Sequence, residues 1–222
     1  MTDIDPLAPA GGRGDATRER ILDLTAALVA RKGFSATSIE ELTVGVGLTK
    51  SGFFYHFPCK LRLAHRLLER LMSRDAALLA DLERAARARH AGPLLAFLGF
   101  LEALAAHADR PGGWRPGSQV AAAVYQETSY DRQIRSLVLA EAERRRGWLR
   151  AWLGEIAQAR RSKSVVDLNA LAEVLATVLY GNPLLSGGAD SGAALSSQLR
   201  LYRDWVSSLF EPAAEPQFRS AA

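Results

Sequence analysis

The sequence predicts an all-α protein, and three observations lead to this prediction. Segments throughout the 222-residue chain repeat their apolar residues at intervals of three and four, which places those residues on one face of a helix. No segment shows sustained alternation of apolar and polar residues bounded by hairpin turn signals, which would indicate strands. Gly33 is placed to end a helix, and Pro58 to precede the start of another.

The composition is that of a folded globular protein. Hydrophobic residues make up 48% of the chain and charged residues 23%, which is close to ordinary usage. The longest apolar stretches, such as residues 93–101, are far shorter than the roughly 20 residues that a membrane span needs. Residues 1–14 have neither the basic start nor the apolar core of a secretory signal. We therefore expect a cytoplasmic protein with no membrane partner.

The first helix is predicted over residues 17–32. Ile21, Leu24 and Leu28 recur there at intervals of three and four, and so share one face. Gly33 follows directly. Because glycine adopts the left-handed conformation without steric cost, it is the residue that most often ends a helix.

A second and a third helix are predicted to be short. Residues 37–40 read Thr-Ser-Ile-Glu and have the S/T-x-x-E form of a capping box, with the Thr hydroxyl as the N-cap, so a helix begins there. Gly45 and Gly47 each lower helix propensity and keep this helix short. Thr49 then offers a new N-cap for a helix over residues 50–56. Two short helices joined by a tight glycine-bounded turn are typical of a helix-turn-helix, whose second helix enters the DNA major groove.

The remaining helices are longer. Proline is tolerated only at a helix start, so the segment after Pro58 predicts a fourth helix from residue 60 to about residue 80. Helical spacing continues to the end of the chain, which leads us to expect about nine helices in all. The later ones are predicted over residues 93–108, 119–127, 130–160, 168–180 and 195–210.

The net charge of +4 is concentrated near the start of the chain. Residues 15–74 hold ten basic and six acidic side chains, whereas the residues after them are almost balanced. A local basic excess is the electrostatic footprint of a nucleic-acid contact, although many solvated helix faces have the same composition.

One string of residues carries a family resemblance. Residues 37–57 read Thr-Ser-Ile-Glu-Glu-Leu-Thr-Val-Gly-Val-Gly-Leu-Thr-Lys-Ser-Gly-Phe-Phe-Tyr-His-Phe and are followed by Pro58, Cys59 and Lys60. Over residues 17–68 this pattern resembles the N-terminal domain of the tetracycline-repressor (TetR) family of transcriptional regulators. The resemblance implies a homodimer that binds a palindromic operator in double-stranded DNA, and a variable helical part that binds a small-molecule effector.

The resemblance also implies a division of the chain. A three-helix DNA-binding domain is joined by the fourth helix to a larger helical domain that binds the effector and dimerises. The expected parts are a flexible arm at 1–14, the helix-turn-helix domain at 15–62, the effector-binding and dimerisation domain at 63–210, and a flexible tail at 211–222.

The resemblance implies, in addition, which residues contact DNA. Thr37 should touch a phosphate at the start of the second helix, Lys50 and its neighbours should face the groove, and His56 and Lys60 should bind the backbone. Physical chemistry agrees, because cationic and hydroxyl groups at helix N-termini favour phosphate. The candidate DNA-contacting residues are Thr37, Thr49, Lys50, Ser51, Gly52, Phe53, Tyr55, His56 and Lys60.

The aromatic residues of this string have a second interpretation. Phe53, Phe54, Tyr55 and Phe57 can instead form the core, and we expect this of Phe57 and one of the others. The family usually has Tyr at the position of Phe54, so one phosphate-binding hydroxyl is missing unless Tyr55 supplies it.

For the larger domain, the aromatic residues suggest an effector pocket. Aromatic walls with a few polar groups are typical of small-ligand cavities, and His107, Gln126 and Glu127 are candidates for the polar groups. An aromatic stripe is, however, more often core than pocket. The candidate effector-binding residues are Phe97, Phe100, Trp114, Tyr125, Trp148 and Trp152.

Two apolar seams near the C-terminus suggest the dimer interface. Their residues recur at intervals of three and four, so each seam is one face of a helix that packs either within the chain or against a partner. The resemblance favours the partner, because the last two helices of the family form a four-helix dimer interface. The candidates are Leu171, Leu175, Val178, Leu195, Leu199, Tyr202, Val206 and Leu209.

An enzyme is the main alternative from another class, and the motifs argue against it. The four histidines form no His-x-x-x-His pair, and there is no Gly-x-Ser-x-Gly or dinucleotide fingerprint. Residues 45–51 resemble a phosphate loop only superficially, since Thr49 stands where that loop needs glycine. Cys59, the single cysteine, lies beside Lys60 as a redox sensor would, but a small helix-entry residue is the simpler interpretation. We expect no catalytic residue, cofactor or metal.

The favoured function is therefore a repressor that a small-molecule effector releases from its operator. The alternative within the same fold is an activator or an effector-independent regulator. Composition and motifs identify neither the operator nor the effector.

Overall fold

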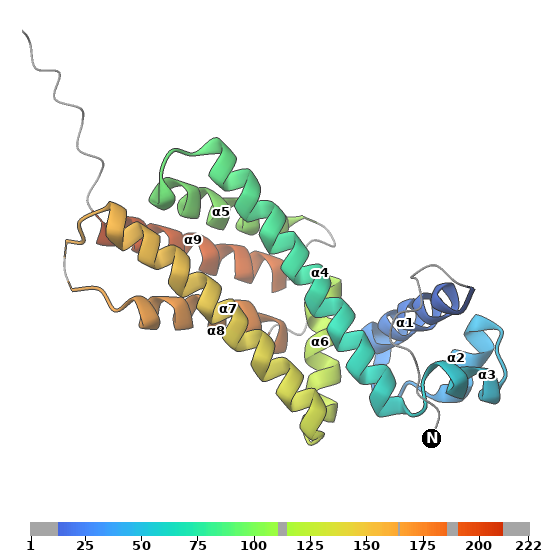
Figure 1. The fold of residues 1–222 in the computed structure, drawn as a ribbon. Coiled ribbons are helices and arrows are strands. Elements are labelled where there is room, and N and C mark those ends of the chain that lie inside the picture. The colour runs from blue at the N-terminus through green and yellow to red at the C-terminus, as the bar shows by residue number, and fades with distance from the viewer. Residues whose placement is uncertain (1–12, 111–114, 164, 186–190, 211–222) are drawn as a thin grey trace, which may run out of the picture. The chain divides into compact units, whose positions relative to one another are not determined.

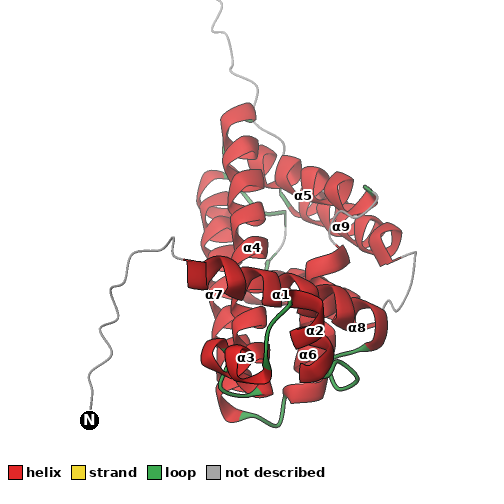
Figure 2. Ribbon diagram, turned by 90° about the vertical axis from the view of Figure 1, so that its right-hand side faces the viewer, coloured by secondary structure: helices red, strands yellow, loops and turns green. Residues whose placement is uncertain are grey.

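The computed structural model describes residues 13–110, 115–163, 165–185 and 191–210. Over these residues the chain forms nine helices, and the one extended pairing is an isolated bridge between Ser162 and Phe210. The all-α prediction is confirmed (Figure 1). Figure 2 shows that helices make up almost all of the described chain. They are α1 (Arg13–Lys32), α2 (Ile39–Val46), α3 (Lys50–His56), α4 (Lys60–Arg89), α5 (Pro93–Asp109), α6 (Arg115–Thr128), α7 (Arg132–Ala159), α8 (Leu168–Leu185) and α9 (Ser191–Leu209).

Helix α4 differs most from its predicted bounds, because it continues to Arg89 rather than ending near Ala80. Residues 81–89 read Asp-Leu-Glu-Arg-Ala-Ala-Arg-Ala-Arg, which are mostly strong helix formers. The next helix-breaking residue is Gly92, and its φ of 82° is left-handed. The helix therefore ends where the first residue that disfavours it approaches.

The start of α2 is capped one residue later than predicted. Ser38, not Thr37, is the N-cap, and its hydroxyl accepts a hydrogen bond from the backbone N–H of Glu41 at 3.1 Å. The Thr37 side chain is buried instead, and its hydroxyl donates to the carbonyl of Gly33 at 2.9 Å. Thr37 thus holds the end of α1, while Ser38 begins α2.

The turn between α2 and α3 has the tight form that the glycines predicted. Gly47 ends α2 with φ 71°, and its N–H donates to the carbonyls of Thr43 and Val44. Thr49 then caps α3, as predicted, by accepting a hydrogen bond from the N–H of Gly52 at 3.1 Å. A left-handed residue and a side-chain cap two residues apart fix where one helix stops and the next begins.

The described helices belong to two compact units, whose division falls within α4 and within α7. The N-terminal unit comprises Met1–Arg74 and Pro116–Val138, so it contains α6 and the start of α7 as well as α1 to α3. The C-terminal unit comprises Asp75–Arg115 and Leu139–Ala222. Each unit has its own hydrophobic core.

In the N-terminal unit, side chains from α1, α2, α3, α4 and α6 meet in one core. Full burial of each large apolar side chain contributes roughly 1.5–3 kcal/mol to the free energy of unfolding. The most deeply buried members include Ile21, Leu42, Phe53, Phe57, Leu63, Leu67 and Val124.

In the C-terminal unit, α9 lies along α5 and beside α8 (Figure 2). The buried residues of α9 belong to the same core as Phe97 and Phe100 of α5. Tyr202 of α9 is also buried, and its hydroxyl donates to the carbonyl of Leu171 in α8 at 2.8 Å. This hydrogen bond links α9 and α8 within one chain.

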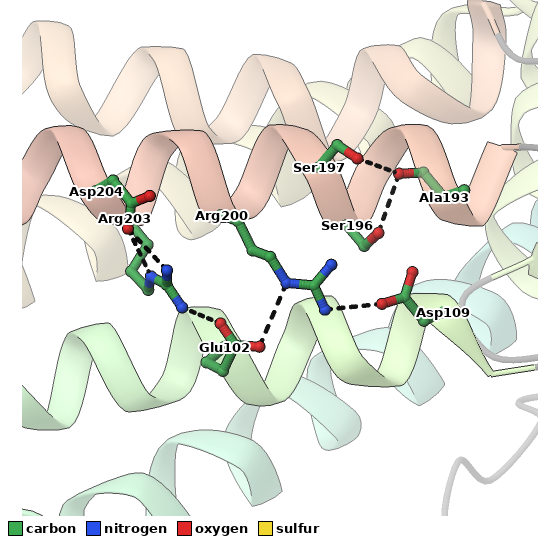
Figure 3. A network of polar contacts seen from close by, with 8 residues as sticks. All are labelled: Glu102, Asp109, Ala193, Ser196, Ser197, Arg200, Arg203 and Asp204. Atoms are coloured by element: carbon green, nitrogen blue, oxygen red, sulfur yellow. Dashed lines mark hydrogen bonds and ion pairs between the residues drawn. The ribbon is translucent and has the colours of Figure 1, made fainter.

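A polar network runs along the outer edge of the α5–α9 contact (Figure 3). Arg200 donates to Glu102 at 3.3 Å and to Asp109 at 2.8 Å, and Arg203 reaches the other oxygen of Glu102. All four side chains are at least 31% exposed. Each such pair stabilises the fold by only about 0–1 kcal/mol, so the apolar residues beneath, rather than these pairs, hold α9 on α5.

Gly47 supplies a prediction about stability. An alanine there would have to adopt φ 71°, although no atom outside the local backbone lies within 4 Å of its Cβ, so the whole cost is conformational. We expect Gly47→Ala to lower the free energy of unfolding by about 1–2 kcal/mol. Gly147 in α7 also has open space around it but no left-handed φ. Gly147→Ala is the control and should be neutral or stabilising by up to about 1 kcal/mol in chemical denaturation.

Candidate nucleic-acid interface

Helix α3 presents one polar and aromatic face to solvent and one apolar face to the core. Lys50, Ser51 and Phe54 are exposed, and Tyr55 is 81% exposed. Seven residues make about two turns of helix, so the residues between the two buried phenylalanines must point outward. This outward face is the candidate DNA-reading surface.

Phe53 does not belong to that surface, and its predicted contact with DNA is corrected. Its side chain is 0% exposed and packs edge-on against Phe54 and near Phe57. Phe53 and Phe57 are four residues apart and so lie on the same face of the helix. The alternative interpretation of these aromatics as core is the one that the structure supports for both.

Thr37 is likewise corrected as a phosphate contact, because its side chain is 0% exposed and its hydroxyl is already bonded to Gly33. The hydroxyl next to it, on the N-cap Ser38, stands at the start of α2 with the partly exposed Glu41 N–H. Ser38 therefore takes the position at the helix start that Thr37 was expected to hold. The ambiguity was visible in the sequence, since Ser38 and Glu41 have the same S/T-x-x-E spacing as Thr37 and Glu40.

Lys50 lies at the start of α3 and pairs with Glu40 of α2 at 2.5 Å. Both side chains are 61% exposed, so solvent screens the pair and it contributes little to stability. The hydrogen bond from Lys50 lowers the pKa of Glu40. An ammonium group held in this way can exchange an exposed carboxylate for another anion at little cost.

The surroundings of His56 favour its neutral form. Partial burial is the main cause that lowers the pKa of its imidazole, and the positive charge of Arg18 lowers it further. Its Nδ1 is buried and has no hydrogen-bond partner. A neutral imidazole can still contact a phosphate as a hydrogen-bond donor.

Lys60 is engaged within the protein. Its Nζ donates to the carbonyl of Ser35 at 3.0 Å and lies 4.8 Å from the centre of the Phe34 ring. Burial lowers the pKa of Lys60, and the nearby carboxylate of Glu127 opposes that shift. A role in anchoring the loop before α2 thus accompanies any contact that this ammonium makes with phosphate.

The structure adds a basic groove that the sequence reasoning missed. It is a cavity of ≈ 590 Å³ within the N-terminal unit, between α1, the end of α3 and the first half of α4. Most of its charge is balanced, since Arg70 pairs with Glu19 and Asp23, and Arg66 with Glu69. The four-residue spacing of its α4 arginines was the available signal. The basic lining residues are Arg18, His56, Arg62, Arg66 and Arg70.

Four of the predicted effector-binding residues come together in the C-terminal unit. Phe97, Phe100 and Trp152 are almost fully buried, with ring centres 5.1–6.3 Å apart, and Trp148 packs against Phe100 and Trp152. Phe97, Phe100 and Trp152 belong to the hydrophobic core of the C-terminal unit, and Trp148 is partly buried against it. Tyr125 packs against the core of the N-terminal unit instead, and Trp114 lies outside the described residues.

A smaller cavity of ≈ 170 Å³ adjoins Trp148 between α4 and α7. Its lining includes Glu141 and Arg145, whose side chains are 6% and 5% exposed and pair at 3.2 Å. The guanidinium of Arg145 also lies 4.7 Å from the ring centre of Tyr180. The Trp148 indole donates to Glu83, another lining residue, at 2.7 Å. A buried ion pair is costly to desolvate, so its position at a cavity is a reason to consider the cavity functional.

The predicted dimer residues are largely core of the single chain, which is a correction. Leu171, Leu175, Leu195, Leu199, Tyr202 and Val206 are all at most 3% exposed, while Val178 and Leu209 are partly buried against the same core. The six buried residues pack within the C-terminal unit and so are unavailable to a partner, whereas Val178 and Leu209 keep part of their surface. Among the described side chains of α8 and α9, the large apolar ones that face solvent are Val174, Leu201 and Trp205.

Potential metal ligands are scattered over the described part of the chain. No three His, Cys, Asp or Glu side chains gather there closely enough to hold a metal ion. Within the same residues, no helix is both long and apolar enough to span a bilayer. Cys59 is exposed and unpaired with any other cysteine.

The fold and the exposed face of α3 define the class of protein as a helix-turn-helix DNA-binding regulator. Residues 21–67 match the family model described as "Bacterial regulatory proteins, tetR family". This match covers the helix-turn-helix segment and agrees with the resemblance that the sequence indicated. None of the curated proteins searched matches the sequence.

Solved structures with the same fold cover nearly the whole chain. A tetR-family regulator from Cytophaga hutchinsonii is 16% identical, with a TM-score of 0.72 over 92% of this chain and 100% of its own. One from Chloroflexus aurantiacus is 22% identical, with a TM-score of 0.68 over 89% and 98%. A third, a transcriptional regulator from Saccharomonospora viridis solved with choline, is 21% identical, with a TM-score of 0.69 over 89% and 99%. At these identities the likeness concerns the fold alone.

The two aromatic residues with opposite exposure on α3 give a prediction. Phe53→Ala removes a fully buried ring, so we expect the free energy of unfolding to fall by about 3–5 kcal/mol. Tyr55→Ala removes an exposed ring and should change that free energy by no more than about 0.5 kcal/mol. We expect it to weaken DNA binding about fivefold, the effect of one lost hydrogen bond. Chemical denaturation and fluorescence anisotropy with labelled DNA measure the two effects. Full DNA affinity in Tyr55→Ala would remove Tyr55 from the interface.

Proposed function

We propose that this protein is a homodimeric repressor that binds a palindromic operator and leaves it when a small molecule binds the C-terminal unit. The observation that carries the proposal is the outward face of α3, where Lys50, Ser51 and Tyr55 are exposed on a helix whose start and orientation are fixed. The match of residues 21–67 to the tetR-family model favours this function over a helical enzyme.

The proposed operator binding predicts salt-dependent binding to specific DNA. Fragments of the genome of the source organism that purified protein retains at a stated salt concentration should share an inverted repeat, because two-fold symmetric dimers read symmetric half-sites. Lys50→Ala should weaken binding to the selected fragment and reduce the slope of log affinity against log salt by about 0.9 per lost phosphate contact. Gln126→Ala, which changes an exposed residue of α6, is the control. A slope that Lys50→Ala leaves unaltered would contradict the phosphate contact.

The proposed dimer interface is based on the exposed apolar residues of α8 and α9. Leu201 is 73% exposed and Trp205 44% exposed. They are four residues apart on α9, so they share one face, and a large exposed apolar pair of this kind is costly unless a partner covers it. We propose that this face, with Val174 of α8, contacts a second copy of the chain.

The proposed dimer interface is tested by one double substitution and one single substitution. Leu201→Glu with Trp205→Glu should give a folded monomer, because both side chains leave the core intact while like charges oppose each other across the two-fold axis. Leu199→Glu should instead unfold the C-terminal unit, since Leu199 is buried and a carboxylate there is unpaired. Light scattering and circular dichroism separate the two outcomes. A dimeric double variant would place the interface elsewhere.

The proposed effector binding is supported by the ≈ 170 Å³ cavity beside Trp148. The structural neighbour solved with choline is an example of this fold with a small molecule present. Binding there releases DNA only if the effector prefers the conformation that binds DNA poorly. A metabolite library screened for release of the selected fragment tests this. An activator, or a regulator that needs no effector, remains the alternative, and a library without any active compound would favour it.

A further inference from the structure

The loop between α1 and α2 is held by a residue far away in the sequence. The carboxylate of Glu127, near the end of α6, accepts hydrogen bonds from the backbone N–H groups of Phe34, at 2.9 Å, and of Ser35. Both N–H groups belong to the segment that leads into α2. All the residues concerned lie in the N-terminal unit.

Lys60 completes the arrangement from the other side. Its ammonium donates to the carbonyl of Ser35 and lies over the ring of Phe34. The backbone of Ser35 is therefore held at its N–H by an anion and at its carbonyl by a cation. These hydrogen bonds, with the charge of Lys60, keep the pKa of Glu127 below its usual value despite partial burial, so Glu127 is an ionised acceptor at neutral pH.

Gly33 makes the close approach possible. Its φ is 85°, and a Cβ atom there would lie only 2.9 Å from Oε1 of Glu127. Glycine at this position thus allows the left-handed backbone at the end of α1 and also leaves space for the carboxylate of Glu127. Nothing in the capping of α1 alone requires the second condition, which indicates that the loop is built around Glu127.

The position of Glu127 ties α6 to the start of α2. Val120 and Val124 of α6 are buried in the same core as Phe53 and Phe57 of α3, and Glu127 follows one turn after Val124. A hydrogen bond is lost once donor and acceptor separate beyond about 3.5 Å. A slide of α6 by one residue, about 1.5 Å, is enough to break the bonds to both N–H groups.

We propose that Glu127 is a positioning residue for DNA binding: it latches the α1–α2 loop to α6 and so holds α2 and α3 in the arrangement that reads DNA. The proposal deepens the proposed function and rests on it for the DNA. Breaking the latch leaves two backbone N–H groups and the Lys60 ammonium without their anionic partner, which favours an opened loop.

The test compares Glu127→Ala with Gln126→Ala, the exposed neighbour on the same helix. Hydrogen exchange of the Phe34 and Ser35 amides should accelerate about tenfold or more in Glu127→Ala, the effect of losing hydrogen bonds to a charged group, and remain unchanged in Gln126→Ala. Affinity for the DNA fragment selected with the wild-type protein should fall about tenfold. The salt slope should stay at the wild-type value, because Glu127 neutralises no phosphate. Exchange in α5 should not change.

Glu127→Gln keeps one carbonyl acceptor and should restore part of both the protection and the affinity, which also provides a folded variant if Glu127→Ala is unstable. By linkage, the DNA fragment should slow exchange at Phe34 and Ser35 in the wild type more than in Glu127→Ala. Unchanged exchange would overturn the latch, and faster exchange with full DNA affinity would overturn its role in positioning. A wild-type protein that retains no DNA would overturn the proposed function, while the exchange measurements without DNA would still decide the latch.

Discussion

The candidate DNA-reading surface depends on the burial of Phe53 and Phe57. These two rings occupy one face of a helix of seven residues, and once that face packs on α1 and α4 the rotation of α3 about its axis is set. Lys50, Ser51 and Tyr55 are then directed to solvent by geometry alone. The left-handed Gly47 and the cap at Thr49 determine where α3 begins. The buried rings, the left-handed glycine and the N-cap thus determine an exposed surface to which none of them belongs.

Local patterns predicted the helices well because helix formation and capping are decided within a few residues. The turn at Gly47 and the cap at Thr49 were both visible in the sequence. The same pattern misplaced the start of α2, since Thr37 and Ser38 each have a glutamate three residues later. Only the packing of the loop decides between them: it buries Thr37 against the end of α1 and leaves Ser38 free to cap.

The apolar seams of α8 and α9 show what periodicity leaves open. Residues such as Leu199 and Val206 recur at the spacing of a buried face, and they are buried. The spacing says nothing of which surface buries them, and the structure shows that α5 and α8 of the same chain do so. Leu201 and Trp205 are also four residues apart on α9, but their side chains remain exposed. The aromatic cluster of Phe97, Phe100 and Trp152 follows the same logic, because large rings suit a core as well as a pocket.

The contact of Glu127 with the α1–α2 loop lies beyond the reach of local patterns. The sequence suggested Glu127 only as a candidate polar group of the effector pocket, whereas its hydrogen-bond partners Phe34 and Ser35 are 92–93 positions away. Gly33 could have indicated this contact. The left-handed end of α1 is, however, a sufficient reason for a glycine there, so nothing in the sequence indicated a second reason. The structure separates the two reasons, since the missing Cβ also makes room for the carboxylate. One glycine can thus satisfy a local and a distant constraint at once, and the distant constraint places α6 among the elements that shape the N-terminal unit.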